Sequence, residues 1–121
     1  MDNLSDLIKE YITATKICYD TDYANKKSVK TNNHAVSRMY KIVEIIALNF
    51  GKEGTEEFKK LLDINENKTN IWAATHLLEK LEPEKDLEIK ALDIIQEVIN
   101  KGGVESLGFQ YWLMQYKNKG K

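Results

Sequence analysis

Apolar residues recur every three or four positions from one end of the chain to the other. This spacing places them on one face of an α-helix, whereas a half-buried strand alternates apolar and polar residues. One proline and six glycines leave few positions that would break a helix. The pattern predicts an all-α fold with helices near residues 4–19, 22–50, 55–63, 68–81, 83–101 and 104–117.

Local residues predict where these helices begin and end. Asp20 or Asp22 is expected to cap the second helix, and the polar stretch 31–33 is a candidate break within it. Gly51 is expected to end that helix, because glycine readily adopts the left-handed conformation that follows many helices. Pro83 is expected at the first position of the fifth helix, where no backbone N–H is needed.

Length and composition predict one domain, residues 1–121, with enough chain to bury a core. Apolar residues make up 42% and charged residues 31%, which excludes a disordered or membrane-embedded chain. The N-terminus lacks a signal-peptide pattern, and no apolar run approaches the roughly 20 residues that span a bilayer. We therefore expect a cytoplasmic protein without a membrane partner. The single cysteine, Cys18, is expected to be a buried, unreactive thiol on an apolar stripe.

Motifs for metal binding or catalysis are incomplete. His34 and His76 do not form a His-Glu-x-x-His motif. The segment 63–67 begins like a calcium loop, but Lys68 and Ala74 stand where the loop needs glycine and glutamate. The many carboxylates fall on predicted exposed faces, and acid–base catalysis needs a pocket. We expect no enzyme activity, no metal and no cofactor.

The net charge of −1 conceals two segments of opposite charge. Residues 79–97 carry seven acidic and three basic residues, a net of −4, and residues 20–41 carry five basic and two acidic residues, a net of +3. Arg38 is the only arginine among 18 basic residues, so nucleic acid is not an expected partner. The acidic segment suits a basic protein partner.

Two helices carry candidate binding surfaces. Trp72, Thr75, His76 and Glu79 have the spacing of one helix face, which we expect to point outward. A tryptophan there is a candidate anchor for a protein partner, and the alternative is that Trp72 packs against a neighbouring helix.

The helix at 104–117 is apolar on two sides, so it is either buried or covered by a partner or a second copy. One stripe consists of Val104, Leu107, Tyr111 and Met114, and the other of Phe109, Trp112, Leu113 and Tyr116. The predicted partner-binding residues are Trp72, His76, Glu79, Glu82, Asp86, Asp93, Trp112 and Tyr116.

A resemblance to a known family adds to these expectations. The segment 65–78, a polar turn followed by a helix with Ala73-Ala74 and Leu77-Leu78, resembles the second helix of a HEAT repeat. It departs from such a repeat at Asn70 and Ile71, where an arginine is usual. With Asn25-Lys26, the run 38–43 and the aromatic last helix, residues 22–117 resemble small bacterial HEAT-like domains of unknown function.

This resemblance implies a right-handed, antiparallel helical array. Members of such families often lie beside secreted-toxin genes and serve as immunity proteins, so it also implies a non-catalytic protein that neutralises a bacterial toxin. The acidic segment favours a basic, nuclease-type toxin whose active site is occluded. One alternative is a structural adaptor or homodimeric helical-repeat scaffold joined through the last helix. A third is a HEAT-like DNA-binding or glycosylase-type protein, which the scarcity of arginine disfavours.

Overall fold

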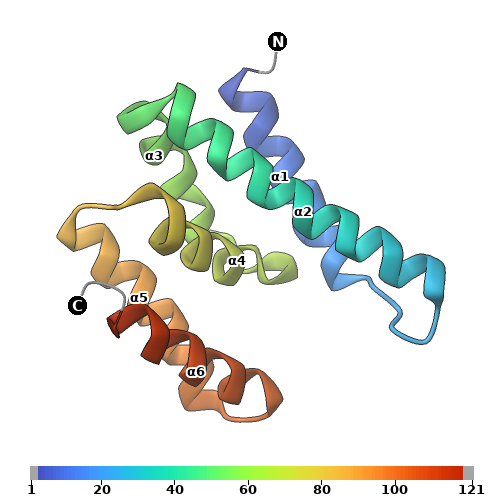
Figure 1. Ribbon diagram of the computed structural model, residues 1–121. Coiled ribbons are helices and arrows are strands. Elements are labelled where there is room, and N and C mark those ends of the chain that lie inside the picture. The colour runs from blue at the N-terminus through green and yellow to red at the C-terminus, as the bar shows by residue number, and fades with distance from the viewer. Residues whose placement is uncertain (1–2, 119–121) are drawn as a thin grey trace.

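The computed structural model describes residues 3–118, and these are helical apart from short connections (Figure 1). The six α-helices are α1 (Leu4–Tyr19), α2 (Lys26–Asn49), α3 (Gly51–Phe58), α4 (Thr69–His76), α5 (Lys85–Lys101) and α6 (Val104–Asn118). Two short 3-10 helices, η1 (Lys59–Asp63) and η2 (Glu66–Lys68), precede α4, and a π-helical turn, η3 (Leu77–Leu81), continues it. The predicted all-α fold is confirmed, and the HEAT-like superhelix stays a prediction.

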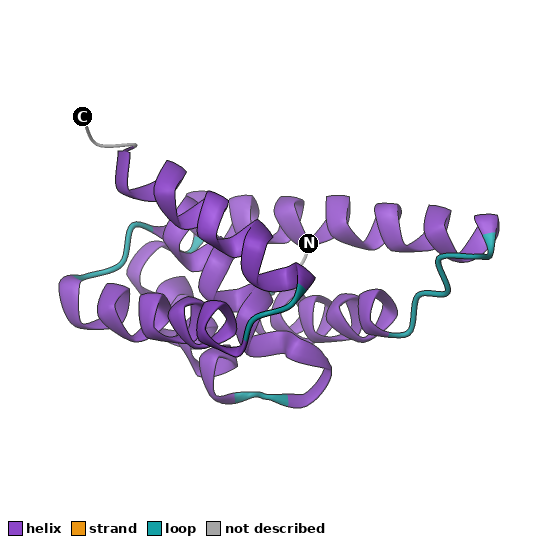
Figure 2. Cartoon of the chain, turned by 90° about the horizontal axis from the view of Figure 1, so that it is seen from below, coloured by secondary structure: helices purple, strands orange, loops and turns teal. Residues whose placement is uncertain are grey.

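The helices follow one another in space as they do along the chain. α1 packs beside α2 at one end of the molecule, α5 packs beside α6 at the other, α4 lies between these pairs, and α3 packs against α2 (Figure 1). The connections between them are short (Figure 2). α4 contacts α1, η1 and α5, so it joins the two end pairs.

α2 begins later than predicted and has no break. The side chain of Asn25 accepts hydrogen bonds from the N–H groups of Lys27 and Ser28, at 2.9 and 3.2 Å, and so caps the helix. The predicted caps, Asp20 and Asp22, are therefore wrong. The helix continues through residues 31–33, and a glycine with φ of +51° follows its end at position 51, as predicted.

The connection from η3 to α5 also differs from the prediction. Glu82 adopts a left-handed conformation with φ of +44°, which is uncommon for a residue other than glycine. The chain turns there, and Glu84 is the residue that precedes the first turn of α5. Pro83 consequently lies before the helix and not at its first position.

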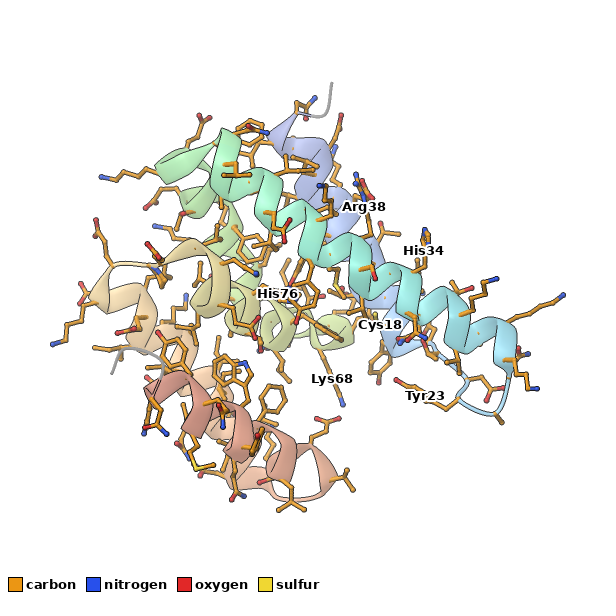
Figure 3. The ribbon with its side chains drawn as sticks, viewed as in Figure 1. Cys18, Tyr23, His34, Arg38, Lys68 and His76 are labelled. Carbon is orange, nitrogen blue, oxygen red and sulfur yellow. The ribbon has the colours of Figure 1, made fainter. Side chains whose placement is uncertain are left out.

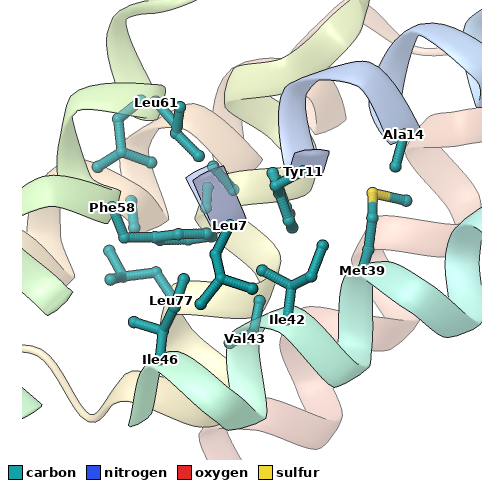
Figure 4. Packing of buried hydrophobic residues seen from close by; sticks show 14 of the residues in the cluster. Leu7, Tyr11, Ala14, Met39, Ile42, Val43, Ile46, Phe58, Leu61 and Leu77 are labelled. Atoms are coloured by element: carbon teal, nitrogen blue, oxygen red, sulfur yellow. The ribbon is translucent and has the colours of Figure 1, made fainter. Parts of the chain in front are cut away.

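The core fills the space between α1, α2 and the segment from α3 to η3 (Figure 4). The rings of Tyr11 and Phe58 meet edge to face, with centroids 5.0 Å apart. Ala73 and Ala74 are fully buried on α4, and their small side chains let neighbouring helices approach its backbone. The other fully buried apolar residues include Leu7, Met39, Ile42, Val43, Ile46, Leu77 and Ile95.

Gly54 lies at a close approach between α2 and α3. A Cβ atom at this position would lie 2.6 Å from Ile46 Cγ2 and 2.9 Å from Phe50 Cβ. We expect Gly54→Ala to lower the free energy of unfolding by about 1–3 kcal/mol, because the new methyl group overpacks this contact. Denaturant titration measures the change, with the exposed Lys52→Ala in the same helix as control. Equal stability of Gly54→Ala and the unmodified protein would contradict the close approach.

Candidate functional site

Two buried polar pairs join α1 to the middle of the chain. Tyr11 Oη lies 2.6 Å from His76 Nδ1, and Thr15 Oγ1 lies 2.7 Å from Thr69 Oγ1. All four residues are buried, with exposed fractions of at most 1%. Both pairs therefore tie α1 to α4 in a region closed to solvent.

His76 is not on an outward face, so its predicted placement is wrong. Figure 3 places it in the interior, between α2 and α4. The reason is that α1 and α2 both cover this side of α4: the ring centroids of Tyr11 and Tyr40 lie 5.7 and 4.6 Å from that of His76. Trp72 lies on the same side, 5.8 Å away, and is half-buried against the core, which is the alternative that the sequence left open.

The surroundings of His76 keep it neutral. Burial, and then the charge of Lys80, lowers the pKa of His76 from its ordinary value of 6.5 to about 4. Burial also raises the pKa of the Tyr11 phenol well above its usual range. Both side chains are therefore uncharged near neutral pH.

The direction of the Tyr11–His76 hydrogen bond follows from counting donors. Among the described atoms, His76 Nε2 has no hydrogen-bond partner. If the Tyr11 hydroxyl donates to Nδ1, the proton is on Nε2 and this one N–H is unsatisfied. If Nδ1 instead donates to Tyr11, both the phenol hydrogen and Nε2 are without partners. Tyr11 is therefore the donor. A general base must reach the proton that it removes, and the His76 imidazole is closed off from solvent in this conformation. Its hydrogen bond to Tyr11 holds α4 to α1.

Reactive groups elsewhere in the described chain are isolated or buried. Within residues 3–118 no group of three or more histidine, cysteine, aspartate or glutamate side chains is placed to hold a metal ion. Cys18 is buried as predicted, and burial raises the pKa of its thiol. None of the described helices has the length and apolar character needed to cross a membrane.

The predicted anchors on α6 hold that helix to its own chain. Trp112 donates its indole N–H to Glu79 at 2.8 Å, and Tyr116 donates its hydroxyl to Glu88 at 2.5 Å. The two rings stack with centroids 5.4 Å apart. Burial, and then the contact with Glu88, raises the pKa of Tyr116 to about 12. Trp112, Tyr116 and Glu79 are thus half-buried in intramolecular contacts.

The opposite side of α6 is exposed. Val104, Leu107, Tyr111 and Met114 are 88%, 69%, 63% and 52% exposed. The two apolar stripes predicted on this helix therefore differ in exposure. The stripe with Trp112 and Tyr116 packs on the rest of the chain, and the stripe with Val104 and Met114 faces solvent. We refer to the four exposed side chains as the α6 stripe.

The remaining predicted residues form a surface, which we call the acidic face. Glu82, Asp86 and Asp93 are exposed at the turn before α5 and on its outward side, and Glu84 lies beside them. Asp86 and Asp93 are two helical turns apart and so point the same way. Ile89 lies between them and is 47% exposed. Within residues 3–118 none of these four carboxylates forms an ion pair.

The basic segment 20–41 lies mainly on the first half of α2, at the end of the molecule away from α5 (Figure 1). Arg38 of this segment donates to Glu10 of α1, with Nη2 and Oε1 2.9 Å apart. This contact lowers the pKa of the Glu10 carboxyl. The two charged segments of the sequence are therefore separated in space.

Comparison of the chain with protein-family models, curated proteins and solved structures finds no match. The resemblance to HEAT-like immunity domains therefore stays a prediction, and the acidic face and the α6 stripe are the candidate functional surfaces.

The buried imidazole makes stability depend on pH. Between pH 6.5 and 4 the unfolded chain protonates His76 and the folded chain does not, so the unfolded state binds more protons and the free energy of unfolding falls as the pH drops. We expect a loss of about 3 kcal/mol across this window. Denaturant titrations between pH 7 and 5 measure the part of this loss that occurs at higher pH, where most carboxylates remain ionised.

Two variants isolate the contribution of this histidine. His76→Gln is expected to be less stable at pH 7 but to lose less stability on acidification. His34→Gln changes an exposed histidine and is expected to keep the pH profile of the unmodified protein. A His76→Gln profile parallel to that of the unmodified protein would show that this imidazole is not held neutral.

Proposed function

We propose that the protein is a non-catalytic binding module whose acidic face docks on a basic surface of a protein partner. One observation carries this proposal: Asp86 and Asp93 flank the exposed side chain of Ile89 on α5, and together with Glu82 and Glu84 at the preceding turn they form no ion pair within the described residues. An apolar anchor with a polar rim is the usual anatomy of a protein interface. The carboxylates would make this interface selective for positive charge.

We further propose that the partner is a nuclease-type toxin and that the protein is its immunity protein. Two features support this: the resemblance of residues 22–117 to HEAT-like immunity domains, and the charge of the acidic face. A nuclease attracts phosphates, so the surface around its active site is basic. An acidic face seated there would exclude the nucleic acid substrate by occupying its place.

The charges and the anchor would act on different steps of binding. Exposed carboxylates attract a basic partner over distances near the Debye length, so they speed association and lose effect as salt increases. Ile89, once covered by the partner, would slow dissociation. This division predicts an association rate that falls with ionic strength.

The proposal predicts that reversing two charges of the acidic face abolishes protection. We expect the protein to restore growth of cells that express the toxin encoded by the neighbouring gene, and Asp86→Lys/Asp93→Lys to fail. The control is Glu44→Lys/Glu53→Lys, which changes the net charge equally at exposed residues of α2 and α3. We expect this control to protect as well as the unmodified protein.

Growth and binding are measured together. Gel filtration of the purified proteins is expected to show a complex with the unmodified protein and with the control, and none with the acidic-face variant. Absence of both rescue and complex for the unmodified protein would reject the immunity function. Equal loss of binding in the two double variants would reject the acidic face as the docking surface.

A further inference from the structure

Glu79 is a half-buried carboxylate that no cation of the described chain neutralises. It lies on η3, and its Oε1 accepts the indole N–H of Trp112. Among residues 3–118 no lysine, arginine or histidine forms an ion pair with it. Its second oxygen, Oε2, accepts no hydrogen bond from these residues and is not closed off from solvent. Because a charge that is partly removed from water is stabilised by an opposite charge, this carboxylate suits a cation from outside the chain.

Glu79 lines a hollow between η3 and α6. The hollow has a volume of about 360 Å³ and is lined by Glu79, Trp112, Gln115 and Tyr116. This volume is near the lower end of the range for small-molecule sites, so the hollow suits a small ligand or the head group of a larger one. Among these four lining residues Glu79 alone is charged, so the site as a whole favours a cation.

The two aromatic rings of the hollow are held in place before any ligand binds. Trp112 and Tyr116 lie one helical turn apart and stack with their ring planes 9° apart. The polar end of each ring is also fixed, since Trp112 donates to Glu79 and Tyr116 donates to Glu88 of α5. The face of an aromatic ring attracts a cation through its quadrupole. Rings that are already fixed lose little conformational entropy on binding, which favours affinity.

We propose that this hollow binds a guanidinium group, which stacks on the aromatic rings and donates hydrogen bonds to Glu79. A guanidinium is planar, so it packs flat on a ring, and its N–H groups match the open Oε2 of the carboxylate. A quaternary ammonium ion carries the charge but has no donor. Urea has a similar shape and donors but no charge. We therefore expect the hollow to select a guanidinium over both.

This site is separate from the acidic face. None of the residues that define the acidic face lines the hollow. The inference therefore goes beyond the proposed function, and it is tested on the purified protein without a toxin. Failure of either proposal leaves the other intact.

An NMR titration tests the proposal, because the indole N–H of Trp112 reports directly on Glu79. Methylguanidinium chloride is added at constant ionic strength, and the indole signal of Trp72 in the same spectrum serves as the reference. We expect a saturable shift of the Trp112 signal with a dissociation constant of about 1 mM. Tetramethylammonium and urea are expected to bind at least about tenfold more weakly, because each lacks one of the two required features.

A further probe distinguishes a free guanidinium compound from an arginine side chain of a peptide. N-acetylarginine amide carries the same head group in the setting of a peptide. Tighter binding of this probe than of methylguanidinium supports the site and assigns it to a peptide arginine. Equal or weaker saturable binding supports the site and assigns it to a small free compound.

Glu79→Gln separates the charge of the site from its hydrogen bond to Trp112. The amide oxygen still accepts the indole N–H, so we expect the fold to be kept and the affinity for methylguanidinium to fall at least about tenfold. The matched control is Glu53→Gln, which removes an exposed carboxylate of α3 and is expected to bind normally. Tyr116→Leu removes one ring and is expected to weaken binding about threefold. Circular dichroism checks that each variant keeps its helical content.

Four results would overturn the proposal. They are the absence of a saturable Trp112 shift, equal affinity for methylguanidinium and either control compound, unchanged affinity in Glu79→Gln, and shifts centred on residues 82–93 in place of the hollow.

Discussion

The hydrogen bond between Tyr11 and His76 is the contact on which the arrangement of the helices depends. It joins residues 65 positions apart, and the Thr15–Thr69 pair repeats the tie between the same two helices. Apolar packing alone allows helices to slide, whereas a buried polar pair is satisfied in one register. α5 packs on α4, and α6 packs on α5, so the positions of the acidic face and the α6 stripe follow from this tie.

The sequence predicts the helices well because each needs only a local pattern of apolar residues. It does not predict which sides of a helix are buried, because that depends on how many neighbouring helices cover them. Periodicity assigned His76 to the polar side of α4, but that side is closed by α1 and α2. Similarly, no local pattern indicates that Trp112 bonds to Glu79, 33 residues away. Asn25 was a detectable cap, since asparagine leads the N-cap preferences and stands directly before the first residue of α2.

The two candidate surfaces differ in chemistry and in how they are held. The acidic face combines a turn fixed by the left-handed Glu82 with the outward side of α5, and its charges suit a basic partner. The α6 stripe is uncharged and exposed. The two apolar sides of α6 differ in their surroundings: Trp112 and Tyr116 fix one side to the rest of the chain, and the α6 stripe on the other side is exposed.

We propose that the acidic face contacts the partner, and that neither the interior nor the α6 stripe does. Hydrogen–deuterium exchange, followed peptide by peptide with and without the proposed toxin partner, measures which surface is covered. We expect slower exchange in peptides that cover residues 82–97, and unchanged exchange in residues 104–115 and in the peptide that contains His76. Protection centred on α6 or on the first half of α2, with residues 82–97 unaffected, would contradict it.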